Sequence, residues 1–307
     1  MQSERKNVHS MNDFTETFRE LGNEKLIMKR IPTGIASLDA ILGGGLVAGV
    51  HTICAEPGAG KTSLVLDIAI NCAISGIPVI IFSYEVPLVD IMTKIYSYVS
   101  ASHFEKNAFS FMDIRVDHTV TASEQKKYTK VWEFVEANIK DQITFVDCIE
   151  KPYTAAQIAY FIDEFVKETQ KTPLIIIDYL QMIAPQNTRL STKNNIEIAM
   201  SVLHAIAEKH CIPILSISSI AKQSSDTLTL FSAAEAARIA YSSVTVLGLQ
   251  EATDTKNDDI SYKTMRVSVF KNRYGASGTS FKLAFDGEHS RFMEIPPPKR
   301  KAAAPKK

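Results

Sequence analysis

The sequence predicts an α/β fold: a mainly parallel sheet flanked by helices, with a carboxy-terminal antiparallel extension. Two observations support this prediction. Short runs that are apolar throughout alternate with helical stretches, as expected when helices cover both faces of a parallel sheet. Near the end of the chain, residues 263–270 and 279–285 form two hairpin-like strands, joined by a turn that contains Gly275 and Gly278.

The composition is that of one large globular domain with short extensions. The 307 residues are 45% hydrophobic and 22% charged, which is enough to bury a full core. The formal net charge is zero, so a nucleic-acid binding track would have to be local. We place the folded domain at residues 31–295, between an amino-terminal arm (1–30) and a proline-rich basic tail (296–307) that we expect to be disordered.

The cysteine and apolar patterns favour a cytoplasmic protein. The four cysteines, at positions 54, 72, 148 and 211, lie in largely apolar runs without metal or redox spacing. This arrangement fits buried thiols in a reducing compartment. No apolar stretch approaches the roughly 20 residues that a membrane-spanning helix needs, and no signal peptide is apparent, so we expect no membrane partner.

The amino-terminal arm contains one apolar pattern. Phe14, Phe18 and Leu21 lie on one face of a short predicted helix. An isolated helix of this length is marginal in water, so it needs a surface to pack against. Two alternatives are open: the helix docks on a neighbouring subunit, or it folds onto its own domain or frays.

The predicted elements alternate along the rest of the chain. A short helix near residues 37–39 ends in the glycine turn at residues 43–45, and the first buried strand follows. The helix after that strand ends at Gly76. Residues 86–160 are mostly helical apart from one strand, and another helix covers residues 195–210. We expect the strands of the sheet at residues 50–54, 79–84, 143–146, 173–178, 213–218 and 243–249.

A glycine-rich loop, residues 55–62, connects the first predicted strand to the next helix. Gly58 and Gly60 allow positive φ and close approach, so the N–H groups of the loop can surround a polyphosphate at the positive end of the helix. Lys61 adds an ammonium for the β and γ oxygens, and the Thr62 hydroxyl is placed to ligate Mg²⁺. The alternative is an accidental glycine-rich turn. The loop predicts an ATP or GTP site with binding residues Glu56, Pro57, Gly58, Ala59, Gly60, Lys61, Thr62 and Ser63.

Two acidic residues follow predicted strands. Asp178 ends an apolar run, where the crevice of an open α/β sheet lies and where Mg²⁺ needs an acidic partner. The alternative for Asp178 is a helix cap. Glu85 follows the second strand and is expected to orient and deprotonate a water that attacks the γ-phosphate. The alternative for Glu85 is a solvated loop glutamate.

Two cations lie at the end of the first hairpin-like strand. Lys271 and Arg273 are two residues apart, so on a strand both side chains point to the same side. Such a pair suits a clamp on developing phosphate charge, and from a neighbouring subunit it would act as an arginine finger with a companion lysine. The alternative is an ordinary solvated strand end.

Together these motifs resemble the motor domain of DnaB-type replicative helicases, in the family's order over about residues 31–295. The block at Lys271 is also similar to RadA-type branch-migration ATPases. Besides the glycine-rich loop, the resemblance depends on Thr33-Gly34, Leu38-Asp39, Leu42-Gly43-Gly44-Gly45, Phe82-Ser83-Tyr84-Glu85, Ile177-Asp178-Tyr179-Leu180-Gln181 and Lys271-Asn272-Arg273-Tyr274-Gly275.

The resemblance implies a RecA-like fold, a homo-hexameric ring with ATP sites between subunits, and 5′–3′ translocation on single-stranded DNA, with replication proteins as partners. It makes the protein an ATP hydrolase with ATP and Mg²⁺ as cofactors. When the family's site residues are transferred to this sequence, the catalytic residues are Lys61, Glu85, Lys271 and Arg273. The metal is then bound by Thr62 and Asp178. The first alternative is a DnaB-like loader, regulator or recombination accessory without processive unwinding. A nucleotide-binding paralogue without turnover is disfavoured because Glu85, Lys271 and Arg273 are all present.

The chain departs from the family pattern in several places. The family's amino-terminal helical domain has no counterpart in these residues, and Ala55 replaces the usual first glycine of the loop. Ser219 stands where the family usually has a glutamine that senses the γ-phosphate. Residues 231–237, the expected pore loop, contain neither a basic residue nor a glycine, and the nearest cation is Arg238. Lys222 is either a nearby phosphate contact or a solvated lysine.

Overall fold

The computed structural model describes residues 28–116, 120–220, 239, 241–252 and 262–295. The predicted helix of the arm therefore lies outside the described residues. The same is true of Lys222, the expected pore loop with Arg238, and the basic tail.

Nine strands among the described residues form one sheet, in the order β3-β2-β4-β5-β1-β6-β7-β8-β9. The pairings from β3 to β6 are parallel, and those from β6 to β9 are antiparallel. The strands are β1 (Gly49–Ala55), β2 (Val79–Ser83), β3 (Ile143–Asp147), β4 (Leu174–Asp178), β5 (Pro213–Ser219), β6 (Thr245–Glu251), β7 (Lys263–Asn272), β8 (Thr279–Asp286) and β9 (Arg291–Glu294). The predicted parallel sheet with an antiparallel extension is confirmed, and β9 adds a strand that the sequence pattern did not indicate.

Helices connect the parallel strands from β1 to β5 along the chain. The α-helices of the described residues are α3 (Ala36–Leu42), α4 (Lys61–Ile74), α5 (Leu88–Phe104), α6 (Phe111–Arg115), α7 (Ala122–Asn138), α8 (Ala155–Thr169) and α9 (Thr192–His210), with 3-10 turns η1 (Glu105–Asn107) and η2 (Leu180–Met182). Thr121 and Thr154 begin α7 and α8 with reciprocal capping boxes, which satisfy N–H groups that a helix end leaves without partners. Within the described ranges, no helix has both the length and the apolar character needed to cross a bilayer.

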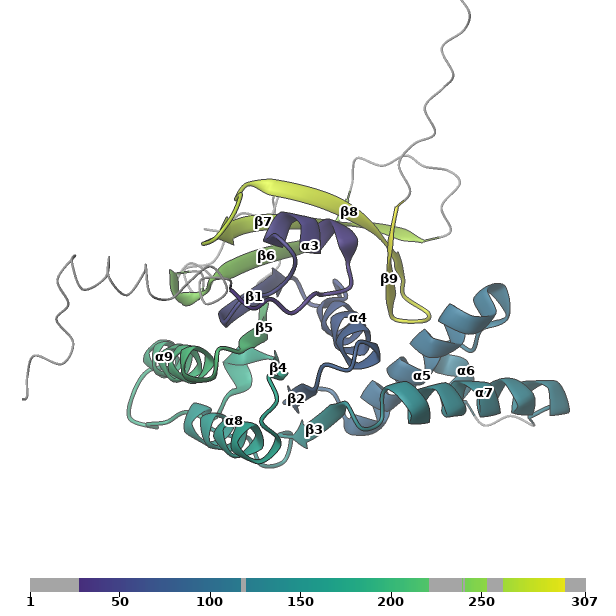
Figure 1. Ribbon diagram of the computed structural model, residues 1–307, viewed down its shortest axis with the longest axis horizontal. Coiled ribbons are helices and arrows are strands. Elements are labelled where there is room, and N and C mark those ends of the chain that lie inside the picture. The colour runs from purple at the N-terminus through teal and green to yellow at the C-terminus, as the bar shows by residue number, and fades with distance from the viewer. Residues whose placement is uncertain (1–27, 117–119, 221–238, 240, 253–261, 296–307) are drawn as a thin grey trace, which may run out of the picture.

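The helices form one layer on each face of the sheet (Figure 1). On β4, Leu174 and Ile176 pack in the same cluster as α4, α5 and α7. Ile175 and Ile177 pack in the cluster with α8 and α9 on the opposite face. Successive side chains of a strand alternate between faces, so a strand covered on both sides must be apolar throughout.

The carboxyl ends of the parallel strands meet at one edge of the sheet. Ala55 of β1 pairs with Ser219 of β5, and Ser83 of β2 pairs with Asp178 of β4. Loops that leave these strands therefore share one crevice.

The cysteines differ from expectation at one position. The thiols at positions 54, 72 and 148 are buried, whereas Cys211 is exposed. Cys211 adopts a left-handed backbone at the carboxyl end of α9, just before β5. Cys211 stands beside the apolar run that forms β5, and the apolar character of that run therefore did not predict that Cys211 is exposed.

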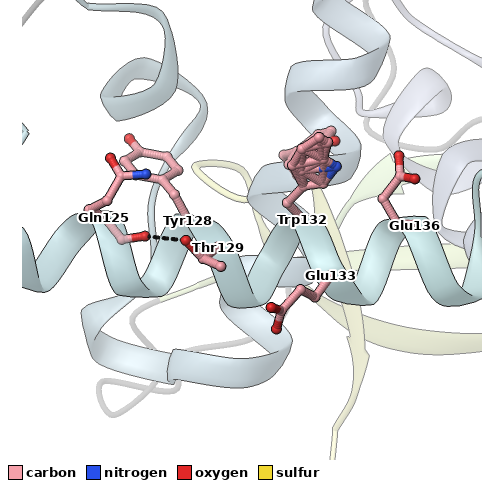
Figure 2. Close-up of a pocket in the computed structure, with 7 residues that line it drawn as sticks. Gln125, Tyr128, Thr129, Trp132, Glu133 and Glu136 are labelled. Carbon is pink, nitrogen blue, oxygen red and sulfur yellow. Dashed lines mark hydrogen bonds between the residues drawn. The ribbon is translucent and has the colours of Figure 1, made fainter.

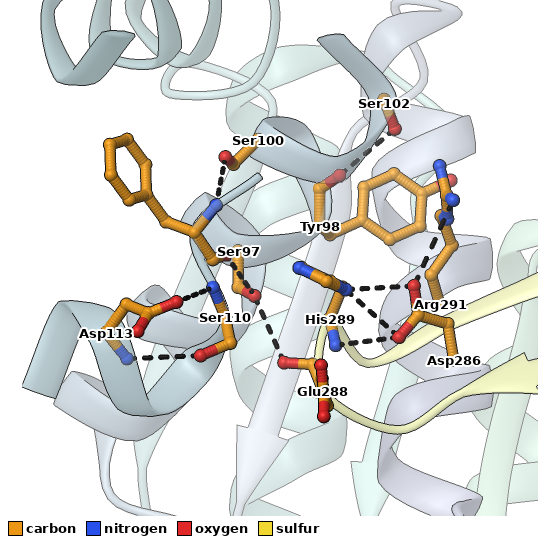
Figure 3. Close-up of polar contacts among 11 residues, drawn as sticks. Ser97, Tyr98, Ser100, Ser102, Ser110, Asp113, Asp286, Glu288, His289 and Arg291 are labelled. Atoms are coloured by element: carbon orange, nitrogen blue, oxygen red, sulfur yellow. Dashed lines mark hydrogen bonds and ion pairs between the residues drawn. The ribbon is translucent and has the colours of Figure 1, made fainter. Parts of the chain in front are cut away.

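The turn between β8 and β9 is bound to α5 and α6. The Glu288 carbonyl accepts hydrogen bonds from Phe111 N at 3.0 Å and from Ser97 Oγ at 3.3 Å (Figure 3). Within the turn, the Asp286 carboxylate contacts His289 Nδ1 at 2.9 Å. The antiparallel extension thus reaches over the helix layer and is fixed there.

The same hairpin contacts α4 and the loop before it. Phe292 N donates to Asp67 Oδ2 at 2.8 Å, and Tyr98 on α5 donates to Asp67 Oδ1 at 3.0 Å. Phe285 and Phe292 stack with ring centroids 4.5 Å apart. A Cβ at Gly60 would lie 3.2 Å from Phe285 Cζ, so this aromatic pair lies directly against the loop.

These contacts predict different effects for two alanine substitutions in the loop. Gly58 and Gly60 both have positive φ, 77° and 88°, so either alanine costs roughly 1 kcal/mol in backbone strain. A Cβ at Gly58 meets nothing within 4 Å, whereas one at Gly60 must displace the Phe285 ring. We therefore expect Gly60→Ala to lower the melting temperature more than Gly58→Ala in thermal unfolding. Equal melting temperatures would contradict the packing of Phe285 on the loop.

Candidate functional site

The glycine-rich loop between β1 and α4 (residues 55–62, hereafter the phosphate loop) has the geometry expected of a loop that binds phosphate. The predicted left-handed glycines are present, and Gly60 immediately precedes the first residue of α4. The N–H groups of the first helical turn face out of the amino end of α4, because a helix offers them no internal acceptors. Among the predicted binding residues, Pro57 and Gly58 are exposed, Glu56, Ala59, Gly60 and Thr62 are half-buried, and Lys61 and Ser63 are buried.

The Lys61 side chain lies back over the start of the loop. Its Nζ donates to the carbonyl oxygens of Ala55 at 3.0 Å and Glu56 at 2.8 Å. The residue is only 8% exposed, and this burial lowers the pKa of the ammonium, while the carboxylates of Asp178 and Glu85 act in the opposite direction. A buried cation thus lies beside two acids at the mouth of the loop.

Asp178 lies at the end of β4 and is 4% exposed. Its Oδ2 accepts a hydrogen bond of 2.7 Å from Thr62 Oγ1. Burial raises the pKa of the Asp178 carboxyl to about 6, and the charge of Glu85 raises it further, against the Thr62 hydrogen bond and the cations Lys61 and Lys94. A hydroxyl and a carboxylate side by side are oxygen ligands of the kind that Mg²⁺ prefers. A divalent cation would favour the ionised carboxylate that burial penalises, so the two residues fit the predicted metal.

Glu85 lies two residues after β2, at the same edge of the sheet. Tyr84 N donates to the Asp178 carbonyl at 2.8 Å, and Ser83 Oγ donates to the Val86 carbonyl at 2.7 Å. These bonds fix the turn that presents Glu85, whose side chain is exposed. Its charge acts on both Lys61 and Asp178, so the structure brings the predicted water-activating residue to the phosphate loop.

Lys271 and Arg273 lie at the opposite end of the sheet, where the parallel strands β1 and β6 begin. Lys271 pairs with Val246 near the start of β6, and Arg273 N donates to the Val244 carbonyl at 2.9 Å. Val244 in turn donates to Val50 at the start of β1, whereas the phosphate loop follows the end of that strand. Five residues of extended chain separate those ends, roughly 16 Å at 3.3 Å per residue. The structure therefore does not bring these two cations to the phosphate loop of the same chain.

The local geometry of this cation pair differs in part from expectation. Arg273 lies one residue beyond the end of β7, in a turn, so strand alternation does not determine its direction. The two charges nevertheless act on each other: burial lowers the pKa of Lys271, and the charge of Arg273 lowers it further. Lys271 Nζ also donates to the Tyr241 carbonyl at 3.0 Å.

Sequence reasoning missed Lys94. Its charge acts on Asp178, and its Nζ donates to Ser290 Oγ of the β8–β9 turn at 3.2 Å. No sequence pattern distinguishes Lys94 from an ordinary helix lysine, since the turn that it contacts is 196 residues away.

A family model described as the DnaB-like helicase C terminal domain matches residues 30–294. The chain belongs to this family. The predicted resemblance is confirmed, and its blocks fall within the matched range.

Curated relatives of this DnaB-like domain are known. The replicative DNA helicase DnaB of Leifsonia xyli is 24% identical over 275 residues, which cover 88% of this chain and 57% of the relative. A probable plasmid replicative DNA helicase of Chlamydia muridarum is 27% identical and covers 86% and 55%. The DNA repair protein RadA of Mycolicibacterium smegmatis is 49% identical over 51 residues, 16% of this chain and 11% of that protein. The chain spans about half the length of the two helicases it matches.

Solved structures show the same RecA-like fold as this DnaB-like domain. One of them, described as an ATPase domain, superposes with a TM-score of 0.77 at 18% identity and covers 94% of this chain and 100% of that one. A DnaB-like replicative helicase, solved to describe its interactions with primase, gives the same TM-score and identity and covers 94% and 69%. The predicted RecA-like architecture is confirmed.

A separate pocket of about 680 Å³ lies on α7 of this DnaB-like domain (Figure 2). Tyr128 and Trp132 line it with Tyr96 of α5, and Glu133 and Glu136 supply carboxylates. Among the described residues that line this pocket, none is basic. It therefore does not suit a polyphosphate, and the phosphate loop remains the candidate site.

The raised pKa of Asp178 predicts a stabilising substitution. The folded carboxyl keeps its proton up to about pH 6, and the unfolded one releases it near the ordinary pKa of 3.8. The contribution of Asp178 to the free energy of unfolding therefore declines as the pH rises from about 4 to 6, and it does not change further above pH 6. We expect Asp178→Asn, which keeps an acceptor for Thr62, to match wild type at pH 4 and to exceed it by about 1–3 kcal/mol at pH 8. Urea unfolding without nucleotide measures both values.

The matched control is Asp147→Asn, at the exposed carboxyl end of β3, which is separated from β4 by β2 in the same sheet. Its side chain is exposed, and asparagine keeps the oxygen that accepts from Ile149 N, so we expect only a small change in stability at either pH. If Asp178→Asn shows no greater gain at pH 8 than this control, the ionised Asp178 carboxylate is not destabilised by burial.

Proposed function

We propose that this protein is a ring-forming, ATP-dependent DNA helicase or translocase of the DnaB type. The observation on which the proposal depends is the cluster at the carboxyl edge of the sheet. There the amino end of α4, the Lys61 ammonium, the Thr62–Asp178 pair and the Glu85 carboxylate lie together. Phosphate-binding amides, a metal-ligating pair and a general base are the parts that nucleoside triphosphate hydrolysis needs.

Each residue of the cluster has a distinct role in this proposal. The loop amides and Lys61 bind the β- and γ-phosphates, and Thr62 with Asp178 holds Mg²⁺, which neutralises charge on the phosphate oxygens when bound. Glu85 accepts the proton of the water that attacks the γ-phosphate. The exposed position of Glu85 leaves that water a path to the site.

The position of Lys271 and Arg273 supports a site shared between subunits. They lie at the end of the sheet opposite to their own phosphate loop, and the charge of Arg273 acts on Lys271. In a head-to-tail ring, one edge of each subunit faces the opposite edge of the next. The pair would then contact the neighbour's γ-phosphate. By resemblance to the family, we propose that the ring is a homo-hexamer that encircles single-stranded DNA. Replication proteins and a cytoplasmic location are proposed on the same ground.

A second candidate function is an accessory or regulatory ATPase without processive unwinding. Ser219, which ends β5 at the site, cannot reach as far as the glutamine expected from the family. In either case, residues 31–295 form the ATPase domain, and the arm (1–30) and tail (296–307) are extensions.

The two functions differ in their response to DNA. If the protein translocates, single-stranded DNA should accelerate ATP hydrolysis by tenfold or more, and Lys61→Ala should abolish it at all DNA concentrations because the transferring phosphate loses its cation. Steady-state ATPase assays, with native mass measured alongside, check both expectations. Hydrolysis that single strands do not stimulate would exclude the translocase and leave the accessory ATPase.

Subunit mixing tests whether Arg273 acts on the neighbouring subunit. Arg273→Ala lacks the distal cation but keeps its phosphate loop, and Lys61→Ala has the reverse defect. In mixed rings some interfaces combine an intact loop with an intact Arg273, so we expect activity well above that of either variant alone. Activity that stays at the sum of the two variants, in samples whose native mass shows mixed rings, would place Arg273 outside the neighbour's site.

A further inference from the structure

The end of β5 lies in the middle of the candidate site. β5 is hydrogen-bonded between β4, which ends at Asp178, and β1, which leads into the phosphate loop. The Thr62–Asp178 hydrogen bond therefore passes over the end of β5. Any shift of this strand end changes the spacing between the metal-ligating side and the phosphate-binding side of the site.

The backbone ladder between β4 and β5 does not extend to this strand end. Their register runs from Ile175↔Ile214 to Ile177↔Ser216. Ser218 and Ser219 continue beyond it, paired with Cys54 and Ala55 of β1. On the β4 side, another contact must hold the last two residues of β5.

The Gln181 side chain supplies that contact. It extends from the 3-10 turn η2, three residues after Asp178. Its Nε2 donates to Ser218 Oγ at 2.9 Å and to the Ser219 carbonyl at 3.2 Å. One amide thus spans the gap that the β4–β5 ladder leaves open.

On the other side, the end of β5 is linked to the catalytic lysine. The Ala55 carbonyl accepts from Ile220 N at 3.1 Å and from Lys61 Nζ at 3.0 Å. Ser218 also lies opposite Cys54 in the β1–β5 ladder. The segment from Ser218 to Ile220 is therefore held between Gln181 and the same carbonyl that orients the Lys61 ammonium.

The unpaired half of the amide argues against a role in stability alone. Gln181 Oε1 is buried and has no hydrogen-bond partner among the described residues. A buried acceptor without a partner destabilises the fold, and leucine, of similar size, would avoid that penalty. The amide is better explained by what its Nε2 positions.

We propose that Gln181 is a positioning residue for ATP hydrolysis, which clamps the end of β5 so that the Asp178 side and the Lys61 side of the site keep the spacing that the transition state requires. The inference rests on the proposed ATPase function. Gln181 does not itself contact the phosphate loop, so its loss should affect the reaction more than nucleotide affinity. Misplacement of catalytic groups by about 1 Å lowers rates by tenfold to a hundredfold.

Gln181→Leu is the test variant, because it keeps the volume and removes both donated hydrogen bonds. We expect kcat to fall about tenfold, the Kd for a fluorescent ATP analogue to change less than twofold, and the melting temperature to stay level or rise. Met182→Ala is the matched control, since Met182 is on the same turn but is 44% exposed. It should leave all three quantities unchanged. A kcat for Gln181→Leu within twofold of wild type, or a loss of affinity equal to the loss of kcat, overturns the proposal.

Hydrogen exchange separates this inference from the proposed function. The Ile220 amide should exchange about tenfold faster in Gln181→Leu than in wild type, because its hydrogen bond to Ala55 depends on a fixed strand end. If wild type hydrolyses no ATP, the proposed function fails, and exchange still tests the clamp. Unchanged exchange at Ile220 overturns the clamp whatever the ATPase result.

Discussion

The hydrogen bond between Thr62 and Asp178 joins residues 116 positions apart and depends on the way the sheet is built. It forms because β1, β5 and β4 run parallel, so that their carboxyl ends lie at one edge. Parallel pairing in turn requires helical crossovers, which cover both faces and make the strands apolar throughout. The meeting of Thr62 and Asp178 at the carboxyl ends of the strands is therefore a consequence of how the chain buries its core.

Much of this arrangement could be predicted from the sequence because its causes are local. Gly58 and Gly60 adopt the positive φ that their residue type permits, and the apolar runs become the parallel strands. Asp178 and Glu85 could be placed because each follows such a run directly. In all these cases the deciding information lies within a few residues of the position concerned.

The rest depends on which strands become neighbours, and sequence spacing does not contain that information. Gln181 reaches Ser219 only because β5 inserts between β4 and β1. Lys94 meets Ser290 only because the β8–β9 turn folds back over α5. Arg273 lies in a turn rather than on β7, since the ladder ends one residue earlier. These are long-range or boundary effects, where local patterns carry little weight.

The attachment of Asp67 limits how this domain can move. Its carboxylate is bound at once from α5, through Tyr98, and from β9, through Phe292, so α4 cannot slide along its axis without breaking both bonds. Burial of those bonds makes such a break costly. The helix that begins at the glycine-rich loop is thus a fixed point of the domain, and any conformational change around the candidate site would consist of other segments moving around it.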